Sequence, residues 1–125
     1  MQHKESAEQQ AVFQWIELNK GKYPELELAH HIPNGGKRNV REAVRLKKEG
    51  VKPGVPDICI PVARNGYHGL YIELKADKGK PSTIQLEWMD RLRKQGYCVA
   101  LCYGWQEAVR YIEGYINGKV WGCNV

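Results

Sequence analysis

Two strand-like segments flank an Asn-Gly pair near the middle of the chain, and they restrict the fold more than any other feature. Residues 57–62 and 69–75 are rich in aliphatic side chains, and the Asn-Gly pair occupies residues 65–66 between them. Such a pair between two strand-like segments is a strong signal for a tight β-hairpin. The pairing predicts that Asp57, at the start of the first strand, lies beside Glu73 near the end of the second.

The hairpin is followed by a helical segment and a third strand, which extends the sheet. Residues 83–95 have a helical pattern that ends at Gly96, and residues 97–103 form an unbroken apolar run. A strand that follows a helical crossover normally pairs in parallel, so we expect a mixed sheet with helices on both faces. The apolar run is too hydrophobic for an exposed edge, and we therefore expect it to be a central strand.

The remaining elements complete a chain of the α/β class. We expect the first helix to begin with a capping box between Ser6 and Gln9, and a second helix to be capped by Asn39. At 125 residues the chain suffices for one domain, which we expect to span residues 1–125. The expected helices are residues 6–20, 39–49 and 105–116, and residues 26–32 are expected to form a short strand.

Positive charge is concentrated in one segment of the chain. The formal net charge is +5, and residues 37–52 alone contain seven cations and two acids. A localised basic segment is typical of a surface that binds a phosphate backbone, although a solvated helix face has the same composition. The seven cations are Lys37, Arg38, Arg41, Arg45, Lys47, Lys48 and Lys52.

Several classes of protein do not fit this sequence. No apolar run approaches the roughly 18–20 residues that span a bilayer, and the N-terminal residues lack the apolar core of a secretory signal. The four cysteines show no CxxC pair, which favours buried thiols in a reducing compartment. A zinc site from these cysteines and His30 or His31 lacks ligand spacing. We therefore expect a cytoplasmic protein of a bacterium or a phage-infected host, with no membrane partner.

Three polar residues of the hairpin form a pattern that suggests chemistry. Glu73 and Lys75 are two residues apart on one strand, so they project from the same face about 7 Å apart, and Asp57 lies alongside. Two carboxylates can hold Mg²⁺ while an ammonium group orients water or stabilises charge on a phosphate. The trio therefore suits metal-assisted hydrolysis of a phosphodiester. A solvated ion pair between Glu73 and Lys75 is the structural alternative.

The motifs along the chain resemble a known nuclease family. Five features appear in order over residues 5–116: Glu8, residues 31–36 (His-Ile-Pro-Asn-Gly-Gly), residues 54–58 (Gly-Val-Pro-Asp-Ile), residues 72–75 (Ile-Glu-Leu-Lys) and residues 85–88 (Gln-Leu-Glu-Trp). Together they resemble the PD-(D/E)xK nuclease superfamily, which has a restriction-endonuclease-like core. More narrowly, the chain resembles a stand-alone virus-type replication-repair nuclease (VRR-NUC) domain.

This resemblance implies a DNA endonuclease that depends on Mg²⁺, with Mn²⁺ as a substitute. Asp57 and Glu73 would be metal ligands, the Leu74 carbonyl would complete the metal shell, and Lys75 would be the catalytic lysine. Gln85 would help to place the attacking water, although it also forms a capping-box pattern with the serine three residues before it. Glu8 would be a further acid of the metal site and would contact the metal directly or through water. The favourable interaction of an acid with the helix dipole in the first turn also explains a glutamate at this position.

The resemblance also implies a DNA interface and a partner subunit. Stand-alone members resemble homodimeric enzymes that cut branched DNA such as Holliday junctions, and a symmetric dimer suits two symmetric cuts. Flap cleavage, nonspecific duplex cleavage and a non-catalytic nucleic-acid-binding module are the alternatives. Four aromatic residues could form the dimer interface, and burial in the core of the monomer explains them equally well. They are Trp105, Tyr111, Tyr115 and Trp121. The expected DNA-binding residues are Asn34, Lys37, Arg38, Arg41, Arg45, Lys78 and Lys80.

Overall fold

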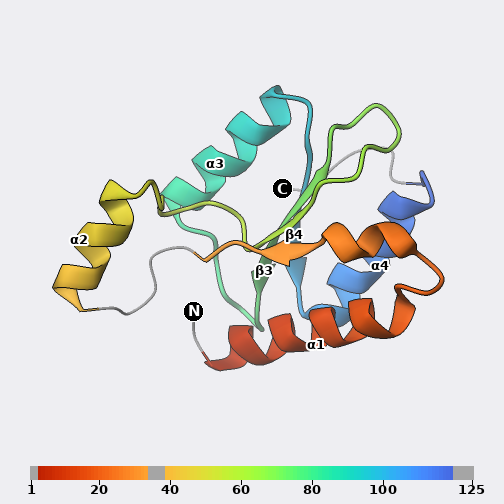
Figure 1. Ribbon diagram of the computed structural model, residues 1–125, viewed down its shortest axis with the longest axis horizontal. Helices are drawn as coiled ribbons and strands as arrows, with labels where there is room; N and C mark the ends of the chain where they lie inside the picture. The colour runs from red at the N-terminus through yellow and green to blue at the C-terminus, as the bar shows by residue number, and fades with distance from the viewer. Residues whose placement is uncertain (1–2, 34–38, 120–125) are drawn as a thin grey trace.

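A four-stranded mixed sheet forms the centre of the fold in the computed structural model, which describes residues 3–33 and 39–119. The strand order is β1-β2-β3-β4, with the first two pairings antiparallel and the last one parallel (Figure 1). The α/β class and the mixed sheet are therefore confirmed. The strands are β1 (His30–His31), β2 (Ile58–Ile60), β3 (Leu70–Lys75) and β4 (Cys98–Tyr103).

The central hairpin forms in the expected register. Ile58 pairs with Ile72, so Asp57, one residue earlier, falls beside the next residue of β3. The turn has φ values of 52° at Asn65 and 87° at Gly66, which are the left-handed values that a type I′ turn requires. The Asn-Gly pair therefore sets the register that brings the polar residues of the two strands together.

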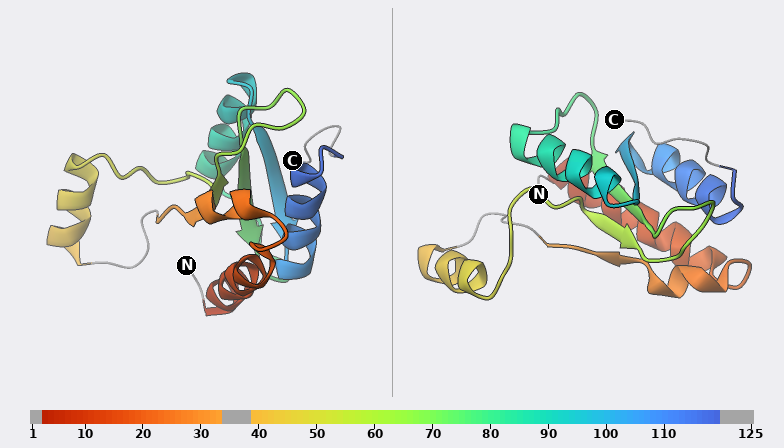
Figure 2. Two further views of the ribbon diagram at one scale, coloured as in Figure 1. Left: turned by 45° about the vertical axis from the view of Figure 1, so that its right-hand side comes forward. Right: turned by 90° about the horizontal axis from the view of Figure 1, so that it is seen from above.

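Helices cover both faces of the sheet in the described residues. The first, α1 (His3–Asn19), packs with α4 (Trp105–Ile116) over one face, while α3 (Thr83–Lys94) packs beside β4 (Figures 1 and 2). The main core joins Val12 of α1 and Ile112 of α4 to the inward residues of β3. No helix in the described part of the chain is long and apolar enough to cross a membrane.

The position of β4 differs from the expectation that it would be a central strand. Among the strands of the described residues it lies at the edge of the sheet and pairs only with β3. Residues from Cys98 to Cys102 are nevertheless buried, because α3 and α4 both pack on this strand. The side chain of Arg93 also donates to the carbonyl of Val99 at 3.1 Å. A parallel strand covered on both faces has the same apolar sequence at an edge as in the centre.

Two expected boundaries are wrong. Residues 24–28 form a 3-10 helix, Pro24–Leu28, and the strand is limited to His30–His31. Proline lacks an N–H and has the φ of a first helical turn, so it starts a helix here despite the alternating pattern. The first helix already includes Ser6, whose hydroxyl accepts a bond from Gln10 at 3.3 Å instead of capping the helix.

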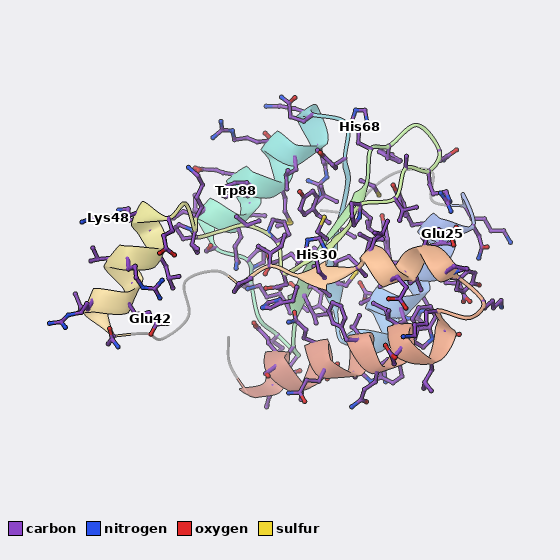
Figure 3. All side chains as sticks on the ribbon, in the orientation of Figure 1. Glu25, His30, Glu42, Lys48, His68 and Trp88 are labelled. Atoms are coloured by element: carbon purple, nitrogen blue, oxygen red, sulfur yellow. The ribbon has the colours of Figure 1, made fainter. Side chains whose placement is uncertain are left out.

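The helix α2 (Val40–Lys48) stands away from the rest of the domain (Figures 1 and 2). It is capped as expected, since the side chain of Asn39 accepts a bond from the N–H of Glu42 at 2.7 Å. None of its residues is buried. The labelled side chains of Glu42 and Lys48 lie on α2, which we call the α2 arm, apart from the strand that carries His30 (Figure 3). A helix with no core contact has most of its surface available to a partner.

Candidate active site

Asp57, Glu73 and Lys75 lie together at the end of β3 and are buried. Their exposed fractions are 6%, 1% and 8%, respectively. The Nζ atom of Lys75 is 3.5 Å from Oε2 of Glu73, and the N–H of Leu74 donates to Oδ2 of Asp57 at 2.9 Å. The side chain of Leu74 belongs to the core on the other face of the sheet. The hairpin therefore brings two carboxylates and an ammonium group into one buried cluster, which is not the solvated ion pair considered as an alternative.

The backbone around Asp57 is held firmly from both sides. Its carbonyl oxygen accepts a bond from the N–H of Ile32 at 2.7 Å, and Nδ1 of His31 lies 2.8 Å from the same oxygen. Earlier in the chain, Gly54 has a φ of +94°, and a Cβ at this position would overlap Ile84 of α3. Only glycine allows both this conformation and this close approach. The turn before β2 therefore fixes where Asp57 enters the site.

Burial alters the ionisation of both carboxyl groups. Loss of water and then the nearby Asp57 carboxylate raise the pKa of Glu73 to about 8, although Lys75 opposes the shift. Burial also raises the pKa of Asp57, against the effect of the Leu74 N–H. Two buried carboxylates this close are unfavourable when both are charged. A bound cation would offset that repulsion.

An unsatisfied oxygen of Glu73 supports a metal site at this position. Its Oε1 atom is buried without a hydrogen-bond partner, which is costly for a carboxylate oxygen. Carboxylate and carbonyl oxygens are the ligands that Mg²⁺ and Mn²⁺ prefer, so Asp57, Glu73 and the Leu74 carbonyl suit these ions. The described residues contain no group of three or more His, Cys, Asp or Glu side chains that could hold a metal. Water would therefore complete the coordination.

Glu8 has a structural partner that the sequence did not reveal. Its Oε1 accepts a hydrogen bond at 2.7 Å from the N–H of Trp105, the first residue of α4. The N-cap residue of that helix is Gly104, which has no side chain to accept such a bond. Glu8 therefore fixes α1 to the start of α4. Its role as a metal-site acid stays a prediction, because it does not form a three-ligand group with the two buried carboxylates.

The expected capping box at the start of α3 is confirmed and involves Gln85. The N–H of Ser82 donates to Oε1 of Gln85 at 2.8 Å, and the Ser82 hydroxyl accepts from the Gln85 N–H at 3.2 Å. This arrangement fixes the side chain through its oxygen and leaves the Nε2 group for another partner. The proposed action of Gln85 on water stays a prediction.

A cavity of about 350 Å³ adjoins Lys75, and its lining contains four lysines and the two acids Glu5 and Asp77. Lys78 and Lys80, both expected to bind nucleic acid, line it from the loop after β3. The start of α1 contributes Lys4 and Glu5, neither of which was expected at the site from the sequence. Their place depends on how α1 packs against the loop, and no motif of the sequence signals it.

The other expected DNA-binding residues divide into two groups. Arg41 and Arg45 are exposed on α2, where Nη1 of Arg45 lies 3.1 Å from Oε1 of Glu49. The positive charge of Arg45 is therefore partly neutralised by Glu49, and that of Arg41 is more available for a phosphate. Asn34, Lys37 and Arg38 lie outside the described residues.

Comparison with known proteins decides the family of this fold and site. The VRR-NUC domain profile matches residues 2–106, which is most of the chain. The chain belongs to the VRR-NUC family. A solved structure described as a VRR_NUC domain protein is similar to this VRR-NUC domain, with a TM-score of 0.79 and 31% sequence identity. The similarity covers 99% of this chain and 95% of that one. No curated protein matches the chain.

Membership in the VRR-NUC family implies a nuclease with DNA as its substrate. Families of this PD-(D/E)xK type generally use a divalent metal, which accords with the buried oxygen ligands of this VRR-NUC domain. The resemblance recognised from the motifs is therefore confirmed at the level of the family and the fold.

Proposed function

We propose that this VRR-NUC domain is a Mg²⁺- or Mn²⁺-dependent endonuclease that cuts one strand of branched DNA per subunit. Holliday junctions are the leading substrate, and a homodimer is the working assembly. The observation that carries this proposal is the buried Oε1 of Glu73, which lacks a partner beside Asp57 and Lys75. A bound divalent cation would satisfy this oxygen, whereas the contact with Lys75 involves the other oxygen, Oε2.

Asp57 and Glu73 act as the charged metal ligands in this proposal, and the Leu74 carbonyl acts as the neutral one. When bound, the divalent cation supplies Lewis-acid polarisation of the phosphate and lowers the pKa of a coordinated water. The N–H of Leu74 holds Oδ2 of Asp57, so the ligand keeps its orientation before the cation arrives. Glu8 supports the site through α4 and would serve as a further acid at the cation, directly or through water.

Lys75 supplies the positive charge that the reaction needs beside the carboxylates. The Nζ atom of Lys75 is restrained by its contact with Glu73, and the residue is only 8% exposed. The side chain therefore loses little conformational freedom when substrate binds. The ammonium group orients the attacking water and stabilises the negative charge that develops on the phosphate. The Nε2 group of Gln85 helps to position that water, while its oxygen remains in the capping box.

DNA binding is assigned to two basic regions of the chain. Lys78 and Lys80 hold phosphates beside the cavity next to Lys75, and α2 holds the backbone further away through Arg41 and Arg45. Asn34, Lys37 and Arg38 join this interface on the evidence of the sequence. An arm that stands away from the sheet suits a substrate wider than one duplex, which supports branched DNA.

A panel of labelled substrates tests the proposal. Wild type and Asp57→Asn are incubated with a four-way junction, a 5′-flap and a linear duplex, in Mg²⁺, Mn²⁺ or EDTA. We expect wild type alone to cut the junction, only with metal, and to leave paired symmetric nicks as a dimer would. Cleavage of the flap or the duplex instead would overturn the substrate and keep the chemistry. Salt-sensitive binding without any cleavage would favour the non-catalytic binding module.

A further inference from the structure

Tyr103 stands beside Lys75 at the end of the sheet. It is the last residue of β4, and the parallel register pairs its Cα with that of Lys75. Neighbouring strands are about 4.8 Å apart, and residues in register on them project from the same face. The phenol ring therefore emerges next to the catalytic lysine, on the face that carries Glu73.

The backbone under Tyr103 is fixed, so the ring has a defined place. The next residue, Gly104, donates its N–H to the carbonyl of Lys75 at 2.9 Å. Gly104 has a φ of +83° and is the N-cap of α4, which turns the chain away at once. A side chain on a strand end held in this way is more precisely placed than one on a loop.

The side chain of Tyr103 has no polar or aromatic partner within the described residues, and part of its ring faces solvent. It is 38% exposed, and its side chain makes no hydrogen bond or ring contact with the described part of the chain. Other tyrosines of the domain are engaged. Tyr71 packs against Tyr97 with 5.2 Å between ring centroids, and the hydroxyl of Tyr23 donates to Glu113 at 2.7 Å. An exposed aromatic ring at a nuclease centre is suited to stack on a nucleobase.

We propose that Tyr103 stacks on the base of a nucleotide adjoining the phosphate that is cut. This inference rests on the proposed nuclease function and adds a source of substrate selectivity to it. A base inside an intact duplex is covered on both faces by its neighbours. Tyr103 can therefore stack only on a base that is unpaired or splayed, as at a branch point, and it favours branched over linear DNA.

The test separates stacking from other effects of the side chain. Wild type is first used to map the cut, and the substrate is then made with either a normal or an abasic nucleotide on each side of that position. Binding of wild type, Tyr103→Ala, Tyr103→Phe and the control Leu18→Ala is measured in EDTA by fluorescence anisotropy. Leu18 is 84% exposed near the far end of α1, so its substitution removes a similar apolar surface away from the site.

We expect Tyr103→Ala to weaken binding about five-fold or more when the base is present, as for other base–aromatic stacks. Tyr103→Phe and Leu18→Ala should bind as wild type does, and the loss in Tyr103→Ala should vanish on the abasic substrate. An equal loss on both substrates, or no loss on either, would overturn the inference. If wild type cuts no substrate, the proposed function itself fails; if it cuts but shows no coupling to the base, only the role of Tyr103 fails.

Discussion

Replacement of Glu8 by alanine or glutamine distinguishes two roles for the acid on α1. In the structure, Oε1 of Glu8 accepts a bond at 2.7 Å from the N–H of Trp105 at the start of α4. A glutamine oxygen can accept the same bond, whereas alanine cannot. If Glu8 mainly fixes α1 to α4, the conservative variant should retain most of its function.

The magnitude follows from the type of contact. Loss of a side-chain cap costs about 0.5–2 kcal/mol, and the negative charge at a helix N-terminus adds about 0.3–1 kcal/mol. We expect Glu8→Ala to lose about 1–2 kcal/mol, and Glu8→Gln to lose only the smaller charge contribution. For a domain of this size, each kcal/mol lowers the Tm by about 4 °C.

Thermal unfolding in EDTA measures these losses without any contribution from bound metal. Cleavage of the junction in excess Mg²⁺ is then compared for both variants below their melting temperatures. Glu8→Gln should cut at close to the wild-type rate. If Glu8→Gln melted like wild type but cut no better than Glu8→Ala, the carboxylate charge would be acting at the metal, and the structural role would be refuted.

Two further outcomes follow from the electrostatics. In EDTA, wild type should lose stability as the pH rises from about 4.5 to 8, because folded Glu73, with its pKa of about 8, still holds a proton that the unfolded chain has released. Glu73→Gln cannot titrate at this position and lacks this pH dependence. In urea unfolding it should be more stable than wild type by up to a few kcal/mol above pH 8, and similar to wild type below pH 4.5. Equal stability of the two proteins at every pH would disprove the raised pKa of Glu73. On the α2 arm, Arg41→Ala should lower the salt dependence of DNA binding by about one phosphate contact, and Arg45→Ala should lower it less because Glu49 already pairs with that arginine. If the salt dependence of DNA binding were the same for Arg41→Ala and wild type, α2 would not be part of the DNA interface.

The sequence predicted the parts of the site that local signals control. The Asn65-Gly66 pair requires a specific turn, and a turn of defined length sets the register that places Asp57 beside Glu73. The caps at Asn39 and Ser82 were also predicted, because each depends on residues only three positions apart.

Features that depend on tertiary packing escaped prediction. The apolar residues of β4 are buried by helices on both faces, and the same residues would suit a central strand, so strand order could not be inferred. Glu8 meets Trp105 across 97 positions of the chain, and Lys4 reaches the cavity only because of where α1 lies. No short pattern encodes such contacts.

Loss of the buried Lys75 ammonium group beside the two carboxylates should abolish the proposed metal-dependent hydrolysis. Single-turnover cleavage of the four-way junction in Mg²⁺ is measured for wild type, Lys75→Ala and the control Lys94→Ala. Lys94 is 72% exposed on α3 and pairs only with Asp90 among the described contacts, so its loss removes a similar charge elsewhere. We expect Lys94→Ala to cut like wild type, and Lys75→Ala to fold and bind the junction but not cut it. Turnover by folded Lys75→Ala well above a protein-free control would show that cleavage does not require Lys75.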